Sequence, residues 1–557
     1  MKMPNSVDFR GRPFHFIGIG GIGMSALAYI LAKRRFPVYG SDLRSTHITK
    51  RLQQTGVRIF SQQEAENLYW FQKDGHREAT TLVSPQPAKF SHESCQPTSQ
   101  DIADTPVQQH RSRSNPQNNG CAGGETKDSH TQLAFSNGLS PTKNVPQVIC
   151  SSAIDPANVE YQAALSLGCP IFHRSDVLAS LMEQYAASIA VAGTHGKTTT
   201  SSLVGHVLLE AGFDPTVAIG GEVATWEGNA RVGESPYFVA EADESDGSLV
   251  KLKSKIGIVT NIELDHPDCY QSLEQVVDTF QTFASGCETV VACIDCKTVR
   301  QALQPSVSYS IQPNVRADYT VENVRYGGSG TVATVLEGGQ VLGELQLQLL
   351  GEHNLSNALA VVAAARQLGI DFTAIAAAVK TFVGASRRFE IRGQYNGILF
   401  VDDYAHHPNE IQATLAAARL RMQEWNEGSP PETCNHSQRR LIAVFQPHRY
   451  SRTRAFLAEF ARAFTHADLT LVSDIYGAGE NNLENLNGSQ VADAIAQYQN
   501  GVEYQSSLED VVQRLKNILR PGDVVLFLGA GNLNQVIPEI MDFYCFWDRP
   551  PAPTQAS

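Results

Sequence analysis

A glycine-rich loop near the middle of the chain constrains its fold most strongly. The loop, GTHGKT at residues 193–198, follows an apolar strand-like segment at 189–192 and precedes a helical stretch that starts at Thr199. Such a strand, loop and helix surrounds a phosphate with backbone N–H groups, while the lysine reaches the β and γ phosphates and the threonine reaches Mg²⁺. Only two residues separate Gly193 from Gly196, and residue 191 is Val rather than Gly. The sequence therefore predicts a compressed phosphate-binding loop in an α/β domain.

A second glycine loop follows the apolar segment 14–17 near the start of the chain. Gly18, Gly20 and Gly23 have the GxGxxG spacing and precede a helical stretch, and Asp42 ends the next predicted strand 19 residues after Gly23. This arrangement is typical of a βαβ unit that binds a nucleotide diphosphate at a helix N-terminus. The pattern does not say which nucleotide binds, so an NAD-dependent oxidoreductase stays open at this point.

The length of 557 residues is several times that of a typical domain of about 150 residues. Strands and helices alternate in three sets, which predicts an α/β protein of three domains at residues 1–186, 187–384 and 385–557. Residues 71–146 are rich in Ser, Gln, Asn and Pro and lack apolar periodicity. We interpret them as a disordered insertion in the first domain.

Charge and composition exclude several classes of function. The net charge of −13 disfavours non-specific binding to nucleic acid or to an anionic membrane. No stretch approaches the ~18 consecutive apolar residues of a spanning helix, so no membrane insertion is expected. The start of the chain does not resemble a signal peptide, and the 10 cysteines have no repeating spacing. We therefore expect a cytoplasmic protein with no nucleic-acid partner.

Acidic residues follow the predicted strand 237–240, in the sequence EADESD. An acid at the carboxyl end of a strand in an α/β domain commonly holds Mg²⁺ directly or through water. Glu241 lies nearest the strand and is the predicted ligand, whereas Asp243, Glu244 and Asp246 are equally well interpreted as a solvated acidic loop. His266 follows the strand 256–260 and could reach the same edge, although a lone histidine is more often structural.

Two loops of the third domain combine histidine with charged residues. DDYAHHP follows the predicted strand 398–401, and QPHRYSRTR follows the strand 441–445. Arginine and histidine in such loops suit recognition of a carboxylate or phosphate, although ordinary surface charge is the alternative. Because both loops follow strands of one domain, they could converge, and we predict a substrate site there.

Together these motifs resemble those of the Mur ligase family. The resemblance rests on IGIGGIGMSALA, AGTHGKTTT, EADESD, TNIELDH, GEHNLSNALA, GASRRFE, DDYAHHPNEI and FQPHRYSRT, in family order, and it covers all but the predicted insertion and the tail after about residue 548. It implies a Rossmann-like N-terminal domain for a UDP-sugar, a central P-loop ATPase-type domain, and a Rossmann-like C-terminal domain that closes over ATP and an amino acid. The motifs are most similar to those of members that join L-alanine to UDP-N-acetylmuramate with ATP and Mg²⁺, as a monomer or homodimer.

The resemblance also implies roles for individual residues. Lys197, Glu241, His266 and Arg388 would act in catalysis, and Thr198, Glu241 and His266 would hold Mg²⁺. ATP would bind to Gly193, Thr194, His195, Gly196, Lys197, Thr198, Thr199, Asn354, Asn357 and Asp402, with Asp403 as the alternative to Asp402. The UDP-sugar would bind at Gly21, Gly23, Asp42 and Ser152, and L-alanine at Tyr404, His406, His448 and Arg449.

Two rival functions share the nucleotide chemistry. One is a sister ligase that joins a whole peptide to UDP-N-acetylmuramate during wall recycling, and the other is a non-catalytic nucleotide-binding regulator. The first glycine loop favours the L-alanine ligases over the peptide ligases. The presence of the lysine, the Mg²⁺ ligands and the amino-acid loops argues against a regulator, and the GTHGKTTT loop argues against an oxidoreductase.

Overall fold

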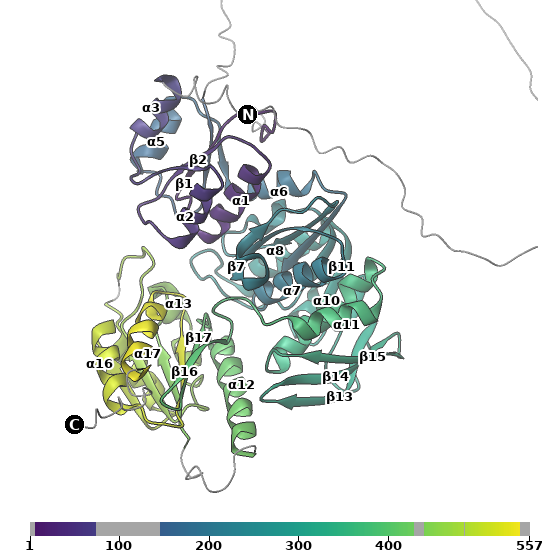
Figure 1. Ribbon diagram of the computed structural model, residues 1–557, viewed down its shortest axis with the longest axis vertical. Coiled ribbons are helices and arrows are strands. Elements are labelled where there is room, and N and C mark those ends of the chain that lie inside the picture. Colours follow the sequence, from purple (N-terminus) through teal and green to yellow (C-terminus); the bar gives the residue numbers. More distant parts are fainter. Residues whose placement is uncertain (1–5, 74–144, 428–438, 484, 546–557) are drawn as a thin grey trace, which may run out of the picture.

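The computed structural model describes residues 6–73, 145–427, 439–483 and 485–545. These residues form three α/β units, each built on its own sheet (Figure 1). The purple N-terminal unit packs against the teal central unit, and the green and yellow C-terminal unit lies below and to the left of the central unit in this view. The predicted α/β fold class with three domains is confirmed.

The N-terminal sheet has five strands in the order β3-β2-β1-β4-β5, and every neighbouring pair is parallel. Parallel strands place all their carboxyl ends at one edge, so the loops after β1, β2 and β4 lie together there. The strands are β1 Phe14–Ile17, β2 Val38–Ser41, β3 Arg58–Phe60, β4 Gln147–Cys150 and β5 Ile171–His173. The helices are α1 Ile22–Lys33, α2 His47–Gln54, α3 Glu66–Lys73, α5 Val159–Ser166 and α6 Arg174–Met182.

The edges of the predicted insertion differ from the structure. Helix α3 continues to Lys73, and Phe71 is buried with its ring 4.9 Å from that of Tyr39. Val145, at the other edge, is also buried. The low apolar content of the segment hid these two anchors, which pack against the first sheet; residues 74–144 lie outside the described residues.

The central sheet has ten strands in the order β15-β14-β13-β12-β11-β10-β6-β9-β7-β8. Its parallel middle carries the glycine loop after β6, and β13, β14 and β15 form an antiparallel extension. The strands are β6 Ala187–Ala192, β7 Thr216–Val223, β8 Gly228–Arg231, β9 Tyr237–Glu241, β10 Ser254–Val259, β11 Cys287–Cys293, β12 Val307–Tyr309, β13 Tyr319–Gly327, β14 Gly330–Glu337 and β15 Gln340–Leu347. The helices are α7 Lys197–Glu210, α8 Leu273–Ser285, α9 Lys297–Ala302, α10 Glu352–Gln367 and α11 Phe372–Thr381, with short 3₁₀ turns at Ala224–Trp226 and Ser248–Lys251.

The central core explains why helix α7 holds the glycine loop firmly. Residues Leu203, Val204 and Val207 of α7 are buried against β6, β7 and α10 in one apolar cluster. Burial of such side chains contributes about 1.5–3 kcal/mol each. The loop is therefore fixed between a fully buried strand and a fully packed helix.

The C-terminal sheet has the order β16-β17-β21-β18-β19-β20, parallel except for the edge strand β16. Its strands are β16 Glu390–Tyr395, β17 Ile398–Asp403, β18 Leu441–Phe445, β19 Leu469–Ser473, β20 Val502–Gln505 and β21 Val524–Leu528. Its helices are α12 Pro408–Glu427, α13 Tyr450–Ala455, α14 Leu457–Phe460, α15 Gly488–Ala496, α16 Leu508–Ile518 and α17 Ile537–Cys545, with a 3₁₀ turn at Leu533–Val536. The loops after β17 and β18 face the central unit, as the contacts below show.

Candidate active site

The glycine loop joins β6 to α7 in a conformation that only glycine accommodates at two positions. Gly196 has φ +84°, and a Cβ there would lie 2.5 Å from Oδ1 of Asn357. A Cβ on Gly193 would lie 1.9 Å from Oγ1 of Thr260. The backbone N–H of His195 donates to Asn261 Oδ1 at 2.8 Å, which holds the loop against the end of β10.

Lys197 is the first residue of α7, and its side chain folds back over the loop. Its ammonium donates to the carbonyl oxygens of Gly193 and Thr194 and lies 2.8 Å from the carboxylate of Glu244, which is 2% exposed. Burial raises the pKa of Glu244 to about 7, although Lys197 acts in the opposite direction. Burial acts to lower the pKa of Lys197, but the nearby carboxylates of Glu244 and Asp243 outweigh it and raise that pKa.

The acidic stretch after β9 is divided between two tasks. The Thr198 hydroxyl donates to Glu241 Oε1 at 3.0 Å, and the backbone N–H of Gly220 donates to Glu241 Oε2 at 2.6 Å. Asp243 and Asp246 instead accept hydrogen bonds from Arg174 of α6, at 2.9 and 3.1 Å. The interpretation of Asp243, Glu244 and Asp246 as a solvated loop is therefore wrong. Arg174 of the N-terminal unit pairs with Asp243 and Asp246, and Lys197 pairs with Glu244.

His266 lies beyond β10 in a left-handed backbone conformation with φ +54°. Its Nε2 is 3.8 Å from Glu244 and 3.6 Å from Asp265, and its Nδ1 is 3.3 Å from the guanidinium of Arg452. Burial lowers the pKa of His266, although Asp265 opposes this. The ring is therefore neutral near pH 7, and it is bracketed by Glu244 of the central unit and Arg452 of the C-terminal unit.

Asp265 and Arg452 form a nearly fully buried ion pair between these two units. The guanidinium Nε donates to Asp265 at 2.9 Å, and the two side chains are 5% and 3% exposed. Burial acts to raise the pKa of Asp265, but His266 and Arg452 outweigh it and hold that pKa far below its usual range. This contact fixes helix α13, which follows the loop after β18, beside His266.

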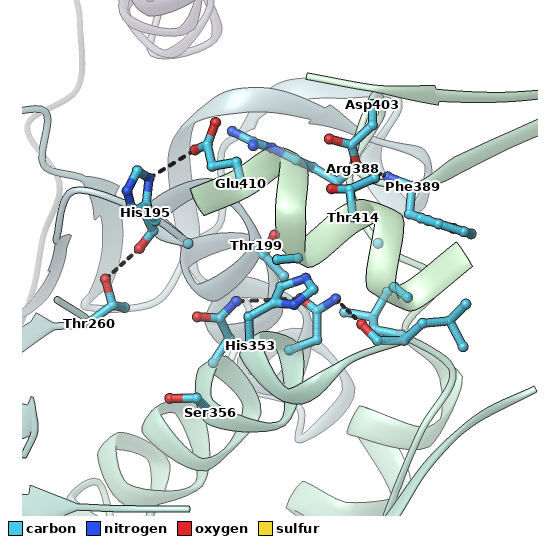
Figure 2. A pocket seen from close by; sticks show the side chains of 18 of the residues that line it. His195, Thr199, Thr260, His353, Ser356, Arg388, Phe389, Asp403, Glu410 and Thr414 are labelled. Carbon is cyan, nitrogen blue, oxygen red and sulfur yellow. Dashed lines mark hydrogen bonds and ion pairs between the residues drawn. The ribbon is translucent and has the colours of Figure 1, made fainter. Parts of the chain in front are cut away.

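A cavity of about 240 Å³ lies between the glycine loop, α10 and the C-terminal unit. Figure 2 shows side chains from both units around it, with His353 and Thr199 on one side and Arg388, Asp403 and Glu410 on the other. Its wall combines apolar side chains with side-chain amides. His353 also lines it, and burial lowers the pKa of this histidine to about 4. The predicted ATP or catalytic residues that line it are His195, Gly196, Thr199, Asn354, Asn357 and Arg388.

Of the two neighbouring aspartates that end β17, Asp403 lines the cavity and Asp402 does not. Asp402 lies 3.5 Å from both Arg387 and Arg392. Asp403 accepts hydrogen bonds from the backbone N–H groups of Phe389 and Ala405, at 2.7 and 2.8 Å. The prediction named Asp402 with Asp403 as its alternative. Successive side chains of a strand point to opposite faces, and the structure places Asp403 at the cavity.

Three of the predicted amino-acid residues come together beside Arg452. The ring of His406 lies 5.3 Å from that of Tyr404 and 6.1 Å from that of His448. Burial lowers the pKa values of His406 and His448 to about 3. Arg449 lies at the margin, where its guanidinium is 2.5 Å from Asp268 of the central unit.

The predicted UDP-sugar residues lie at the carboxyl edge of the N-terminal sheet. Asp42, after β2, accepts a hydrogen bond from the backbone N–H of Gly20 at 2.8 Å and so ties down the first glycine loop. A Cβ on Gly23 would lie 3.3 Å from Nη1 of Arg174, the same guanidinium that binds Asp243. Gly21 caps α1, and Ser152 lies in an exposed turn after β4.

Family models identify the chain. The Mur ligase family catalytic domain matches residues 13–98, the Mur ligase middle domain matches 191–365, and the Mur ligase glutamate ligase domain matches 387–531. The chain belongs to the Mur ligase family. This membership confirms the predicted enzyme class, a ligase.

Individual Mur ligases are similar over almost the full length. The UDP-N-acetylmuramate–L-alanine ligase of Nostoc punctiforme is 55% identical, covering 98% of this chain and 98% of the relative. The enzyme of the same name from Gloeothece citriformis is 53% identical over 97% of this chain and 99% of its own. The solved UDP-N-acetylmuramate-alanine ligase of Thermotoga maritima is 25% identical with a TM-score of 0.71, covering 96% of this chain and all of that chain.

Four residues that contact this Mur ligase's site were not predicted from the sequence: Arg174, Glu244, Glu410 and Arg452. Glu410 and Arg452 lie inside the motifs DDYAHHPNEI and HRYSRT, so their position in these motifs is the signal that could have found them. Arg174 carries no such signal, because its role depends on how α6 packs against the central unit. Among the described helices, none is both long enough and apolar enough to cross a membrane.

Proposed function

We propose that this Mur ligase joins L-alanine to the lactyl carboxylate of UDP-N-acetylmuramate and converts ATP to ADP and phosphate. The observation that carries the proposal is the identity of 53–55% to ligases named for this reaction, over nearly the whole of both chains. The geometry supports it, because one cavity adjoins the glycine loop and is walled on its other side by Arg388, Asp403 and Glu410 of the C-terminal unit.

Lys197 would bind the phosphates of ATP in place of its present partner Glu244. The Thr198 hydroxyl and the Glu241 carboxylate, 3.0 Å apart, are oxygen ligands of the kind that Mg²⁺ prefers, so this pair fits the ion. His266 is a weaker fit, since it is an imidazole that lies against Glu244 and Asp265. When bound, Mg²⁺ would neutralise charge on the transferring phosphoryl group.

The reaction would proceed in two steps. The lactyl carboxylate attacks the γ-phosphorus of ATP, so that a bond from carboxylate oxygen to phosphorus forms and the bond to ADP breaks. The amine of L-alanine then attacks the acyl carbon, and phosphate leaves from the tetrahedral intermediate. Arg388, at the cavity wall, is placed to stabilise negative charge on the phosphoryl group during the first step.

L-Alanine must lose a proton before its amine can attack. The rings of His406 and His448 are neutral near pH 7, because burial holds their pKa values at about 3. A neutral ring nitrogen can orient the incoming ammonium by accepting its hydrogen bond, but rings of such low pKa are too weakly basic to take up the proton, which would pass to water or to the departing phosphate. These two rings, beside Tyr404, therefore form the proposed binding site for the amino acid.

The cavity also suits protection of a reactive acyl phosphate. Its walls come from the central and C-terminal units, so that approach of the two units excludes water from the reacting groups.

The seven cysteines of the described residues are free thiols, which fits the proposed location in the reducing cytoplasm.

The test is phosphate release from ATP and Mg²⁺ with each co-substrate present or omitted. We expect release only when UDP-N-acetylmuramate and L-alanine are both present. L-Serine and glycine, added separately, measure the selectivity of the amino-acid site. Release that requires the stem tripeptide instead of L-alanine would assign the chain to the recycling ligases, and nucleotide binding without turnover would favour a regulator.

A further inference from the structure

Three side chains on separate loops meet at the junction of the central and C-terminal units. His195 belongs to the glycine loop, Glu263 follows β10, and His407 immediately precedes α12. One ligand atom from each lies within 4.8 Å of the other two, and the two imidazole rings are 4.7 Å apart. Glu263 and His407 have no part in the proposed reaction, whereas His195 also lines the cavity described above.

The polar atoms of this cluster are incompletely paired within the described structure. Nε2 of His195 and Nε2 of His407 are buried and make no hydrogen bond. Nε2 of His195 instead lies 3.4 Å from Oε2 of Glu263. Ligands bound at about 2.0–2.1 Å to a tetrahedral ion lie about 3.3–3.4 Å from one another, so this separation is that of two ligands on one edge of the tetrahedron.

Two of the three side chains, His195 and Glu263, are held in place by hydrogen bonds from residues outside the cluster, as the ligands of a metal ion commonly are. Nδ1 of His195 is 3.0 Å from Oε1 of Glu410, which leaves Nε2 directed at Glu263 (Figure 2 shows the contact between His195 and Glu410). The side-chain amide of Asn409 donates to Oε2 of Glu263 at 2.6 Å. A histidine held by a carboxylate through its second nitrogen is the usual arrangement at zinc sites, where it fixes the ring and raises its basicity.

We propose that His195, Glu263 and His407 form a binding site for a divalent transition cation of the Zn²⁺ class, separate from the Mg²⁺ site at Thr198 and Glu241. Two imidazoles and one carboxylate suit Zn²⁺ far better than Mg²⁺, which prefers an all-oxygen environment. Because His407 belongs to the C-terminal unit and the other two ligands to the central unit, the bound ion links the glycine loop to α12. Occupancy then slows separation of the two units.

The same contacts have a simpler interpretation, in which a protonated His195 bridges Glu263 and Glu410 without any metal. A metal at Nε2 replaces the proton on that nitrogen, so the two states exclude each other. The simpler state leaves the buried Nε2 of His407 without a partner, whereas a bound ion would use a nitrogen of that ring. The two interpretations therefore differ in whether His407 contributes to cation binding.

The test is calorimetric titration of the nucleotide-free protein with Zn²⁺ in excess Mg²⁺, which competes at the oxygen site. We expect one equivalent of Zn²⁺ to bind. Glu263→Gln and His407→Ala should each weaken that binding more than about 100-fold, and Glu410→Gln should weaken it by about 10–100-fold, as loss of an orienting partner does. Glu263 is 38% exposed, so its substitution decides the test even if His407→Ala fails to fold.

Two control variants separate this site from other histidines and carboxylates. His47→Ala removes an exposed histidine that pairs with Glu222 at 2.8 Å, and Glu241→Gln removes the proposed Mg²⁺ ligand. Both should keep the Zn²⁺ equivalent, and Co²⁺ in its place should give the visible absorption of a four-coordinate site in every protein that binds. Absence of binding, or binding that is lost in Glu241→Gln but kept in Glu263→Gln, would overturn the proposal.

Discussion

The ammonium of Lys197 lies 2.8 Å from the buried carboxylate of Glu244. In this arrangement the cation that would bind ATP is held by a carboxylate 47 residues away and by two carbonyl oxygens of its own loop. These contacts keep the ammonium beside the glycine loop. They also compensate for the loss of its hydration before any phosphate binds. Phosphate binding exchanges one anionic partner for another, so that Lys197 needs little reorganisation.

Replacement of Lys197 by alanine should abolish phosphoryl transfer. Removal of one preorganised hydrogen-bond donor to a transition state typically lowers kcat by about 10²–10³-fold. The loss should be at least this large for Lys197, because its ammonium also carries the positive charge that would face the phosphates. Phosphate release with saturating ATP measures the loss. Lys251→Ala is the matched control, because Lys251 is 40% exposed and pairs with Asp176 at the surface; equal loss of activity in both variants would contradict the assignment.

Gly196→Ala and Gly212→Ala should separate backbone strain from steric exclusion. Both glycines have positive φ, +84° and +80°, so either alanine adds strain of about 1–2 kcal/mol. Only at Gly196 does the new Cβ meet Asn357, at 2.5 Å, whereas nothing lies within 4 Å at Gly212. We expect both variants to lower the Tm, and only Gly196→Ala to weaken ATP binding, by 10-fold or more in calorimetric titration. Normal ATP affinity in Gly196→Ala would refute the proposed phosphate loop.

The charge of His195 should make the junction of the central and C-terminal units depend on pH. Burial acts to lower the pKa of His195, but Glu263 and Glu410 outweigh it and raise this pKa to about 10, above the unfolded value of 6.5. The stabilisation is therefore fully present below about pH 6.5 and is lost as the pH rises toward 10. In metal-free buffer, the difference in Tm between wild type and His195→Gln should shrink over that window. His47→Gln, at an exposed histidine, is the control, and a constant difference for His195→Gln would contradict the ion pairs.

Asp403→Asn and Asp402→Asn should affect different properties of the enzyme. Asp403 lines the cavity, so loss of its charge should raise the KM for ATP by about 10-fold. The Tm should fall as well, because asparagine can accept only one of the two backbone hydrogen bonds that Asp403 accepts. Asp402 is buried 3.5 Å from Arg387 and Arg392 and does not line the cavity, so its substitution should lower the free energy of unfolding by about 1–3 kcal/mol and leave this KM within 2-fold. The reverse pattern would restore the original assignment of Asp402 to ATP binding.

Much of the fold could be predicted because its signals are local. The segments around β9 and β18 are short apolar runs, and their predicted positions agree with the structure to within a residue. The antiparallel extension β13–β15 was not predicted, although its alternating strands and the glycine pairs at 327–328 and 338–339 are hairpin signals. The three domain boundaries stay predictions.

The sequence by itself determined the chemistry of the glycine loop. Lys197, Thr198 and the glycines are nearly contiguous after one strand, and Glu241 ends another strand of the same α/β domain, so all of them are expected at the carboxyl edge of one sheet. Only the tertiary structure decided that Glu244 holds Lys197, that Arg452 meets Asp265 and His266, and that Asp403 rather than Asp402 faces the cavity. Lys197 and Glu244 come from separate loops of one sheet, whereas Arg452 and Asp265 come from different units. Asp402 and Asp403 point to opposite faces of one strand, so all these contacts depend on tertiary packing, which no local pattern encodes.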